Sequence, residues 1–268
     1  MSEQLQSDFD KITKTSKISE EEIQIKKIFL NKFIKSGFPN RKQEDWKFLD
    51  ISQIIKKNIG DLSFFYDYSL PNKIDTSIFV DGLEHNKIIF INGRIEKIDF
   101  NYEDKDKIEI NDEIEKKISF DYKNSLIDLN RALTIKVFKI SVKKNYSLKK
   151  PLIIYHSTND KISSKNVNLR LDFELEENSS LRLIDYFSKS VDKNFINILY
   201  NFNLKNYSIL KNYKIDKFKN NNVKYSFNNI EQNSNSVSET FILSAGSDYF
   251  KNEVNCNCLL YTSDAADE

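Results

Sequence analysis

The chain has 268 residues, 39% of them hydrophobic and 30% charged, which is long enough to bury one or two full cores. Its 41 Lys and Arg residues balance 40 Asp and Glu residues, so the formal net charge is only +1. A chain with this balance has no overall field that would draw it onto nucleic acid or an anionic membrane, and we expect neither as a partner.

The first 19 residues are polar and mixed in charge, so no signal peptide is expected. No run of apolar residues approaches the 18 or so that a membrane-spanning helix needs. The two cysteines, Cys256 and Cys258, are too close together to crosslink distant parts of a fold. These features favour a cytoplasmic protein in a reducing compartment.

Two helices are predicted before residue 60. Ser19 is a suitable N-cap for a helix whose first turn carries Glu20–Glu22, and Gly37 followed by Pro39 is a typical stop. A second, short helix is predicted over residues 46–57. Its apolar face would consist of Phe48, Leu49, Ile51, Ile54 and Ile55.

The pattern changes to β after residue 61. Residues 87–95 form a β run with an Asn92-Gly93 pair, which predicts a hairpin or a sharp turn. Residues 103–121 are dominated by charge, and we expect a linker or a polar helix there. Residues 126–133 are short and apolar, which predicts a helical turn before the main sheet.

Strand follows strand from residue 134 onward. Apolar and polar residues alternate over 167–175, 198–204 and 223–227, and another strand begins at Phe241. We therefore expect one buried and one solvated face per strand. In the first strand, Phe138 breaks the alternation and predicts a β-bulge.

The connections between these strands are polar and contain few of the five glycines and three prolines of the chain, so Asn and Asp are expected to form the turns. Amphipathic helices between the strands are missing, which argues against βαβ units. A sandwich, a barrel and a β-solenoid remain open, because no repeat period can be fixed.

Candidate ligand residues are few. His85 lies in a polar stretch and is expected to be solvated, whereas His156 ends a strand and is expected to be satisfied by hydrogen bonding there. Neither has a second His or Cys at metal-binding spacing, so no zinc site is predicted. Cys256 and Cys258 could face one side of a strand, but two thiolates alone make an incomplete site. Trp46, the only tryptophan, is predicted to anchor a helix on the core.

The sequence contains no phosphate-binding loop, no dinucleotide fingerprint and no nucleophile elbow. Carboxylates are plentiful, but no spacing singles out an acid and a base. We therefore predict no enzymatic activity, and we assign no catalytic, cofactor-binding or metal-binding residue. A non-catalytic scaffold is the expectation.

Residues 37–48, Gly-Phe-Pro-Asn-Arg-Lys-Gln-Glu-Asp-Trp-Lys-Phe, resemble the N-terminal signature of the SufD family of iron–sulfur cluster assembly proteins. Asn40 stands where Thr or Ser is usual. The stretches 129–156 and 250–254 agree with the family in the same order, so the resemblance covers about residues 20–257. The matching signature positions are Gly37, Pro39, Arg41, Lys42, Glu44, Trp46, Lys47 and Phe48.

The resemblance implies a mainly β fold, with a right-handed parallel β-helix core after a small helical (α+β) N-terminal domain. The expected boundaries are residues 1–105 for the N-terminal domain and 106–257 for the β-helix. It also implies a non-catalytic scaffold subunit of the Suf complex, whose partners are a SufB paralogue and the SufC ATPase. The complex builds a transient Fe–S cluster from sulfur delivered by a cysteine desulfurase, and this chain itself is expected to bind no cofactor.

The family's β-helix continues further and is followed by a helical domain, so we expect this sequence to be incomplete at its C-terminus. Residues 258–268 break the composition and resemble a translated sequencing-library adapter, which predicts a non-native tail. The family's cluster-related histidine and its SufC-docking region would lie in the missing part, so no residue is carried over as a cluster ligand.

Two alternatives remain. One is a SufB-type paralogue of the same complex, against which the Trp46 motif argues. The other is a β-helix carbohydrate-active enzyme, which would need clustered Asp, Arg or Lys on one face and usually carries a signal peptide.

Overall fold

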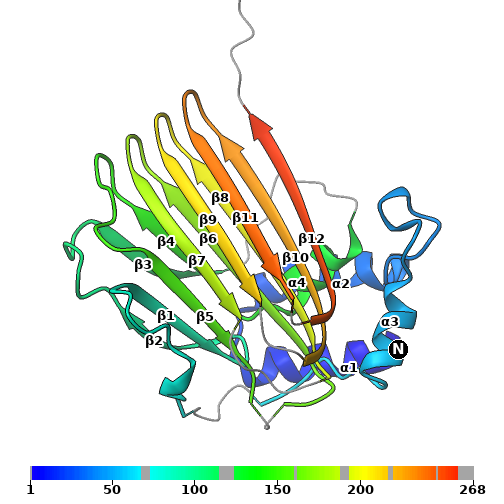
Figure 1. Cartoon of the computed structure of the whole chain (residues 1–268). Helices are drawn as coiled ribbons and strands as arrows, with labels where there is room; N and C mark the ends of the chain where they lie inside the picture. The colour runs from blue at the N-terminus through cyan, green and yellow to red at the C-terminus, as the bar shows by residue number, and fades with distance from the viewer. Residues whose placement is uncertain are drawn as a thin grey trace, which may run out of the picture.

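The chain winds as a β-helix between two mainly parallel sheets, and a helical region precedes them (Figure 1). The computed structural model describes residues 2–67, 73–114, 124–159, 162–187, 193–216, 220–245 and 247–258. Strands make up 43% and helices 24%, and the β-helix has about four turns. The predicted mainly β class, the parallel β-helix and the helical N-terminal region are therefore confirmed. The predicted tail falls, from residue 259 on, outside the described residues.

The helical region contains α1 (Ser2–Thr15), α2 (Glu20–Ser36), the short 3₁₀ helix η1 (Glu44–Trp46) and α3 (Ile51–Asn58). α2 begins and ends as predicted. The Ser19 hydroxyl accepts a hydrogen bond from the Glu22 N–H at 3.3 Å. At the other end Gly37, with φ of 66°, donates its N–H to the Phe33 carbonyl at 2.7 Å.

The second predicted helix is wrong in its extent. Trp46 belongs to η1, and α3 begins only at Ile51, because the Asp50 side chain caps the Gln53 N–H. Phe48, predicted on the apolar helix face, is 80% exposed between the two helices.

The predicted hairpin at Asn92-Gly93 is confirmed. It joins β1 (Asn86–Ile91) to β2 (Arg94–Asp99) through a two-residue turn, in which Asn92 and Gly93 have φ of 54° and 75°. Positive φ at both positions is typical of the turn that fits strand twist best. β1 also pairs in parallel with β5 (Leu152–Ser157), so the first sheet of the β-helix begins at residue 86.

The prediction of a linker or polar helix over 103–121 is wrong for residues 108–113. These residues form β3 (Ile108–Glu113), which pairs antiparallel with β4 (Val137–Val142). Ile108 and Ile110 are partly buried against the apolar core inside the β-helix, the lumen, and this packing favours a strand despite the acidic neighbours. Residues 115–121 lie outside the described part. The helical turn predicted at 126–133 is confirmed as α4 (Ser125–Leu133).

From β4 onward successive strands alternate between the two sheets, which run β11-β9-β7-β5-β1-β2 and β12-β10-β8-β6-β4-β3. Asn166 pairs with Phe195, Phe195 with Val223, and Val223 with Tyr249, so successive coils are offset by 29, 28 and 26 residues. This shrinking period explains why no repeat was visible in the sequence. The remaining elements are η2 (Thr76–Ile78), β6 (Asn166–Leu175), β7 (Ser180–Phe187), β8 (Phe195–Leu204), β9 (Ile209–Asp216), β10 (Asn220–Gln232), β11 (Val237–Ser244) and β12 (Ser247–Cys258).

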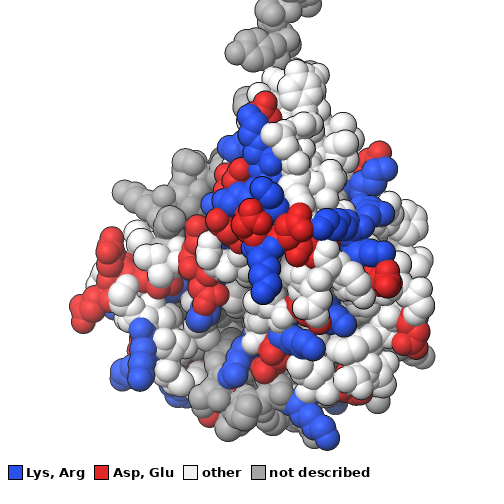
Figure 2. Space-filling model, turned by 90° about the vertical axis from the view of Figure 1, so that its left-hand side faces the viewer, with Lys and Arg blue, Asp and Glu red and all other residues white. Residues whose placement is uncertain are grey.

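The turns between coils are formed by Asn, as predicted. Asn145, Asn178 and Asn235 have φ of 59°, 59° and 58°, and Tyr207 takes the equivalent turn between β8 and β9 with φ of 60°. The Asn178 amide donates to the Asn145 side-chain oxygen at 3.0 Å, so neighbouring turns are linked. On the face shown in Figure 2, Lys and Arg side chains are interspersed with Asp and Glu.

The predicted bulge at Phe138 is wrong. β4 pairs with β6 without a register shift, because Val137 and Phe138 are both buried, on opposite faces of the strand. The expectation of one solvated face per strand is wrong for the first halves of β6 and β8 in the same sheet, where the helices cover the outer side. The outward residues of their second halves are half-buried. This second core contains Phe29, Phe33, Trp46, Leu129, Phe195, Leu199, Val223 and Tyr225, whereas the lumen holds a separate apolar cluster.

Candidate functional site

A layer of polar side chains crosses the otherwise apolar lumen of the β-helix. In β7 the inward positions run Leu181, Leu183 and then Asp185, and the β7–β9 register places Lys214 beside Asp185. Both side chains are almost fully buried, at 0% and 3% exposed. Buried charges in a lumen of this kind are rare unless they are paired, so this layer is the strongest candidate site.

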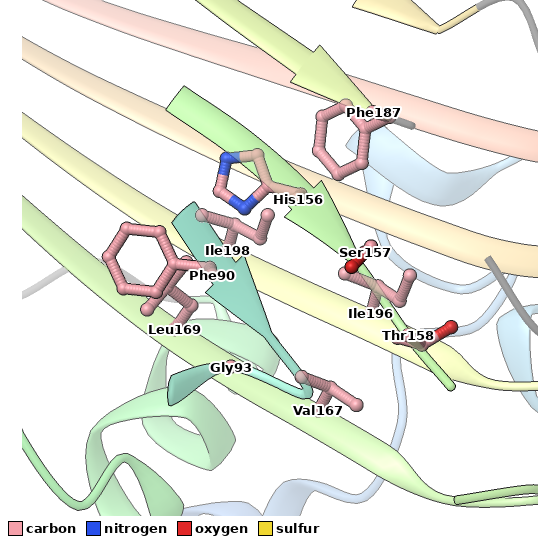
Figure 3. Close-up of a pocket in the computed structure, with 10 residues that line it drawn as sticks. All are labelled: Phe90, Gly93, His156, Ser157, Thr158, Val167, Leu169, Phe187, Ile196 and Ile198. Carbon is pink, nitrogen blue, oxygen red and sulfur yellow. The ribbon is translucent and has the colours of Figure 1, made fainter. Parts of the chain in front are cut away.

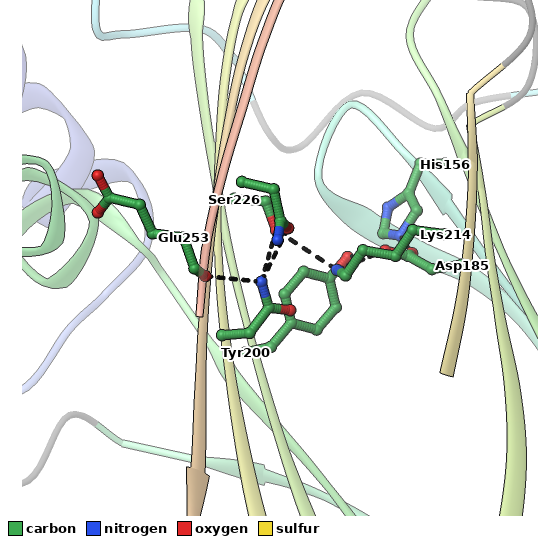
Figure 4. A network of polar contacts seen from close by, with 8 residues as sticks. His156, Asp185, Tyr200, Lys214, Ser226 and Glu253 are labelled. Atoms are coloured by element: carbon green, nitrogen blue, oxygen red, sulfur yellow. Dashed lines mark hydrogen bonds and ion pairs between the residues drawn. The ribbon is translucent and has the colours of Figure 1, made fainter. Parts of the chain in front are cut away.

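Asp185 is the centre of the layer (Figure 4). Its Oδ1 lies 2.5 Å from Nε2 of His156, and its Oδ2 accepts a hydrogen bond from the Tyr200 hydroxyl and lies 3.1 Å from Nζ of Lys214. The three partners come from β5, β8 and β9, so one carboxylate connects both sheets. The His156 ring is stacked between Phe90 and Phe187, at centroid distances of 5.6 and 4.8 Å.

The network continues toward the later coils. Lys214 lies 3.4 Å from the Ser226 hydroxyl and 3.5 Å from the centroid of the Tyr200 ring, a cation–π contact. The Asn228 amide donates to Ser226, at 3.4 Å, and to the side-chain oxygen of Asn252 at 2.9 Å. Polar contacts therefore run from β5 to β12.

A second buried ion pair lies beside the first. Nζ of Lys224 is 2.7 Å from Oδ2 of Asp216 and 4.4 Å from the centroid of the Phe187 ring. The two pairs together carry no net charge. In each pair a carboxylate lies next to an ammonium, which offsets part of the cost of burying the two charges.

Burial and ion pairing shift the pKa values of Asp185 and Lys214 in opposite directions. Burial raises the pKa of Asp185, but the charges on Lys214 and His156 and the Tyr200 hydrogen bond outweigh it and hold the pKa far below its ordinary value. Burial lowers the pKa of Lys214, and Asp185 offsets this only in part. Burial and the adjacent carboxylate both raise the pKa of Tyr200. The partners of Asp185 therefore favour its carboxylate form.

The space beside this network is small. A cavity of about 20 Å³ touches His156 and is otherwise lined mostly by apolar side chains, among them Phe90, Phe187 and Ile198 (Figure 3). Such a volume suits about one water molecule. The network itself joins side chains from both sheets of the β-helix.

Of the predictions for the two histidines, one is confirmed and one is wrong. His156 is confirmed as a hydrogen-bonded strand-end residue. The prediction that His85 is solvated is wrong: it is 7% exposed, with Nδ1 2.6 Å from the Leu83 carbonyl and Nε2 2.8 Å from the Tyr155 hydroxyl. Tyr155 comes from β5, 70 residues later, and no local pattern announces that contact.

Trp46 is confirmed as a core residue, at 3% exposed. Its ring lies 5.9 Å from the Tyr225 ring and 4.3 Å from Nζ of Lys251. Lys251 also donates to the Asp45 carbonyl at 2.9 Å and pairs with Glu253 at 2.9 Å. The tryptophan therefore anchors the helical region on β10 and β12 of the β-helix.

Cys256 and Cys258 do lie on one side of β12. Their sulfurs are 3.6 Å apart, both side chains are exposed, and the Gln232 side-chain oxygen is 3.0 and 3.3 Å from them. Among the described residues, no group of three or more His, Cys, Asp or Glu side chains is arranged to hold a metal ion.

The charged lumen residues were missed in the sequence. The alternation of residues along β7 could have identified Asp185. It follows Leu181 and Leu183 at every second position and therefore faces the lumen as they do. Lys214 and Lys224 lie in strands whose inward face was not distinguishable from the outward face, so their burial had no comparable signal.

No protein-family model and no curated protein matches the chain. Within the described ranges, no helix has both the length and the apolar character required to cross a membrane. An assignment of function therefore depends on the signature stretch, the fold and the contacts that join them.

Proposed function

We propose that this chain is a SufD-type scaffold subunit of a cytoplasmic iron–sulfur cluster assembly complex. The observation that carries the proposal is the docking of Trp46, from the signature stretch 37–48, onto Tyr225 and Lys251 of a parallel β-helix. The stretch that resembles the family is thus packed against the architecture that the resemblance implies.

The lumen supports a scaffold role. The charged side chains of the polar layer are paired with one another, and the adjoining cavity suits one water molecule. Such an interior stabilises one register of coils, as buried polar groups do in some other proteins. In this proposal ATP hydrolysis belongs to a SufC-like ABC ATPase, and the Fe–S cluster is the product of the complex with a SufB-like paralogue.

Co-purification tests the proposal. The protein is co-expressed with a SufB-like and a SufC-like protein and isolated through a tag on the SufC-like protein. We expect a stoichiometric complex, and no ATP hydrolysis by this protein alone. A folded protein that stays out of the complex, and that acts on a polysaccharide, would instead identify it as a β-helix carbohydrate-active enzyme.

A further inference from the structure

The outer face of the sheet β11-β9-β7-β5-β1-β2 carries two continuous apolar rows. The strand registers align Ile153, Ile184, Tyr213 and Phe241 in the first row, and Ile89, Tyr155, Tyr186, Ile215 and Leu243 in the second. Each row therefore crosses at least four strands at the spacing of about 4.8 Å between neighbours. We call these the outer rows.

The chain itself covers one half of the outer rows. Ile78, Phe79 and Val80 pack on the side of β1, β5 and β7. The Phe79 ring lies 5.1 Å from the Tyr155 ring, and the Val80 N–H donates to the Tyr155 hydroxyl at 3.1 Å. Tyr155 and Ile153 are consequently fully buried, at 0% exposed. The structure thus shows the kind of segment that fits this face: irregular, apolar and aromatic.

The other half is uncovered by any described residue. Tyr213 is 37% exposed, Phe241 57% and Leu243 47%, although they continue the same two rows. Beside them Lys211 and Glu239 form an ion pair of 3.3 Å, and the strand register places Arg182 next to Lys211. A contiguous exposed apolar patch of this kind is typical of an interaction site.

We propose that Tyr213, Phe241 and Leu243 form a docking surface for an extended apolar segment of a partner protein, with the chemistry of Ile78-Phe79-Val80. The two halves are continuous, so a segment that fits one half has matching rows on the other. Tyr213 brings a hydroxyl to the uncovered half, in the first row, whereas Tyr155 lies in the second. The inference uses only this surface and does not depend on the proposed function.

A peptide with the sequence of residues 73–80, Lys-Ile-Asp-Thr-Ser-Ile-Phe-Val, is a suitable probe. We expect the fluorescently labelled peptide to bind the chain saturably, and the double variant Tyr213→Ser/Phe241→Ser to weaken binding at least tenfold. Ile98→Ser is the matched control, because Ile98 is also apolar and 46% exposed but lies on β2. A peptide carrying Ser in place of Phe should not bind.

If the double variant fails to fold, a photo-crosslinking residue at position 243 provides a second test. It leaves Tyr213 and Phe241 unchanged. It should capture the peptide, and the same group at position 98 should not. The proposal is overturned if no saturable binding occurs up to about 1 mM peptide. It is also overturned if the patch variants bind as well as the control, or if sedimentation shows a dimer that Phe241→Ser dissolves, which would assign the surface to a second copy.

Discussion

The ammonium of Lys251 lies 4.3 Å from the centroid of the Trp46 ring, and the same ammonium donates a hydrogen bond to the carbonyl of Asp45. The hydrogen bond joins residues 206 positions apart in the sequence. The short helix η1 and the last described strand, β12, therefore form one packing unit, although no local signal connects them.

Replacing Trp46 should weaken the packing of η1 on β12. We expect Trp46→Ala to lower the free energy of unfolding by about 3–5 kcal/mol, the range for large-to-small changes of buried aromatic residues. Phe48→Ala is the control, because Phe48 is 80% exposed and a surface change should stay within about 0.5 kcal/mol. Urea unfolding measures both, and equal effects would contradict the anchoring role of Trp46.

The buried pair Asp185 and Lys214 should show strong energetic coupling. Asp185→Asn alone leaves the Lys214 ammonium unpaired in the lumen, and Lys214→Met alone leaves the carboxylate without its cation, so each should cost about 3–5 kcal/mol. The double variant should recover most of that loss. A double-mutant cycle by urea unfolding measures the coupling, and additive costs would argue against a direct interaction.

The depressed pKa of Asp185 predicts a specific acid sensitivity. An Asp in the unfolded chain has a pKa of about 3.9, so this carboxylate contributes its full stabilisation above that pH and loses it as the pH falls toward the lower folded pKa. We expect the free energy of unfolding to fall below about pH 4, and to fall less steeply in the variant Asp185→Asn/Lys214→Met.

Some acid sensitivity should survive in that variant. Burial raises the pKa of Glu103, but hydrogen bonds from Asn86, Tyr146 and two backbone N–H groups outweigh it and lower the pKa. A double variant with the full acid dependence of the wild type would refute the assignment to Asp185.

The steric requirement for glycine at position 93 can be tested by comparison with Gly82, which has a similar φ. Gly93 and Gly82 have φ of 75° and 72°, so Ala costs about 1 kcal/mol at either position through the backbone. A Cβ at Gly93 would also lie 3.0 Å from Cγ1 of Val167, whereas one at Gly82 would meet no atom within 4 Å. Thermal unfolding should therefore show a larger loss for Gly93→Ala than for Gly82→Ala, and the reverse order would exclude the steric contribution.

Tyr207 offers a stabilising change. It has φ of 60° in a turn where the equivalent residues of neighbouring coils, Asn178 and Asn235, tolerate that conformation better. We expect Tyr207→Asn to raise the free energy of unfolding by about 1 kcal/mol. Asn178→Ala should lower it, since it loses both the tolerant residue and the hydrogen bond to Asn145. A neutral or destabilising Tyr207→Asn would show that the ring makes compensating contacts.

Local chemistry was predictable from the sequence. The Ser19 cap, the Gly37 stop and the Asn92-Gly93 hairpin each depend on residues within four positions of one another, and each is present. The alternation over 167–175 likewise marks a real strand, β6. Neighbouring residues alone decide these features, so a single sequence contains them.

Long-range placement was not predictable. Residues Val223, Tyr225 and Phe227 alternate as Ile198 and Tyr200 do, yet they face the helices, whereas Ile198 and Tyr200 face the lumen. Alternation shows that a strand has an apolar face but not what covers it. The meeting of Asp185 with Lys214 depends on an offset of 29 residues in a repeat whose length changes from coil to coil.

The two kinds of corner in the β-helix differ in how much length they allow. From β6 onward the turns with the left-handed residue span four positions between consecutive strands, 176–179, 205–208 and 233–236, whereas the opposite connections shorten from 158–165 to 188–194 and 217–219. The earlier turn that contains Asn145 is longer, at 143–151. From β6 onward the differences in coil length thus arise at the opposite connections. The four-residue turns keep neighbouring coils in register. Insertions and deletions at the opposite connections would change the length of one coil without shifting the coils on either side of it.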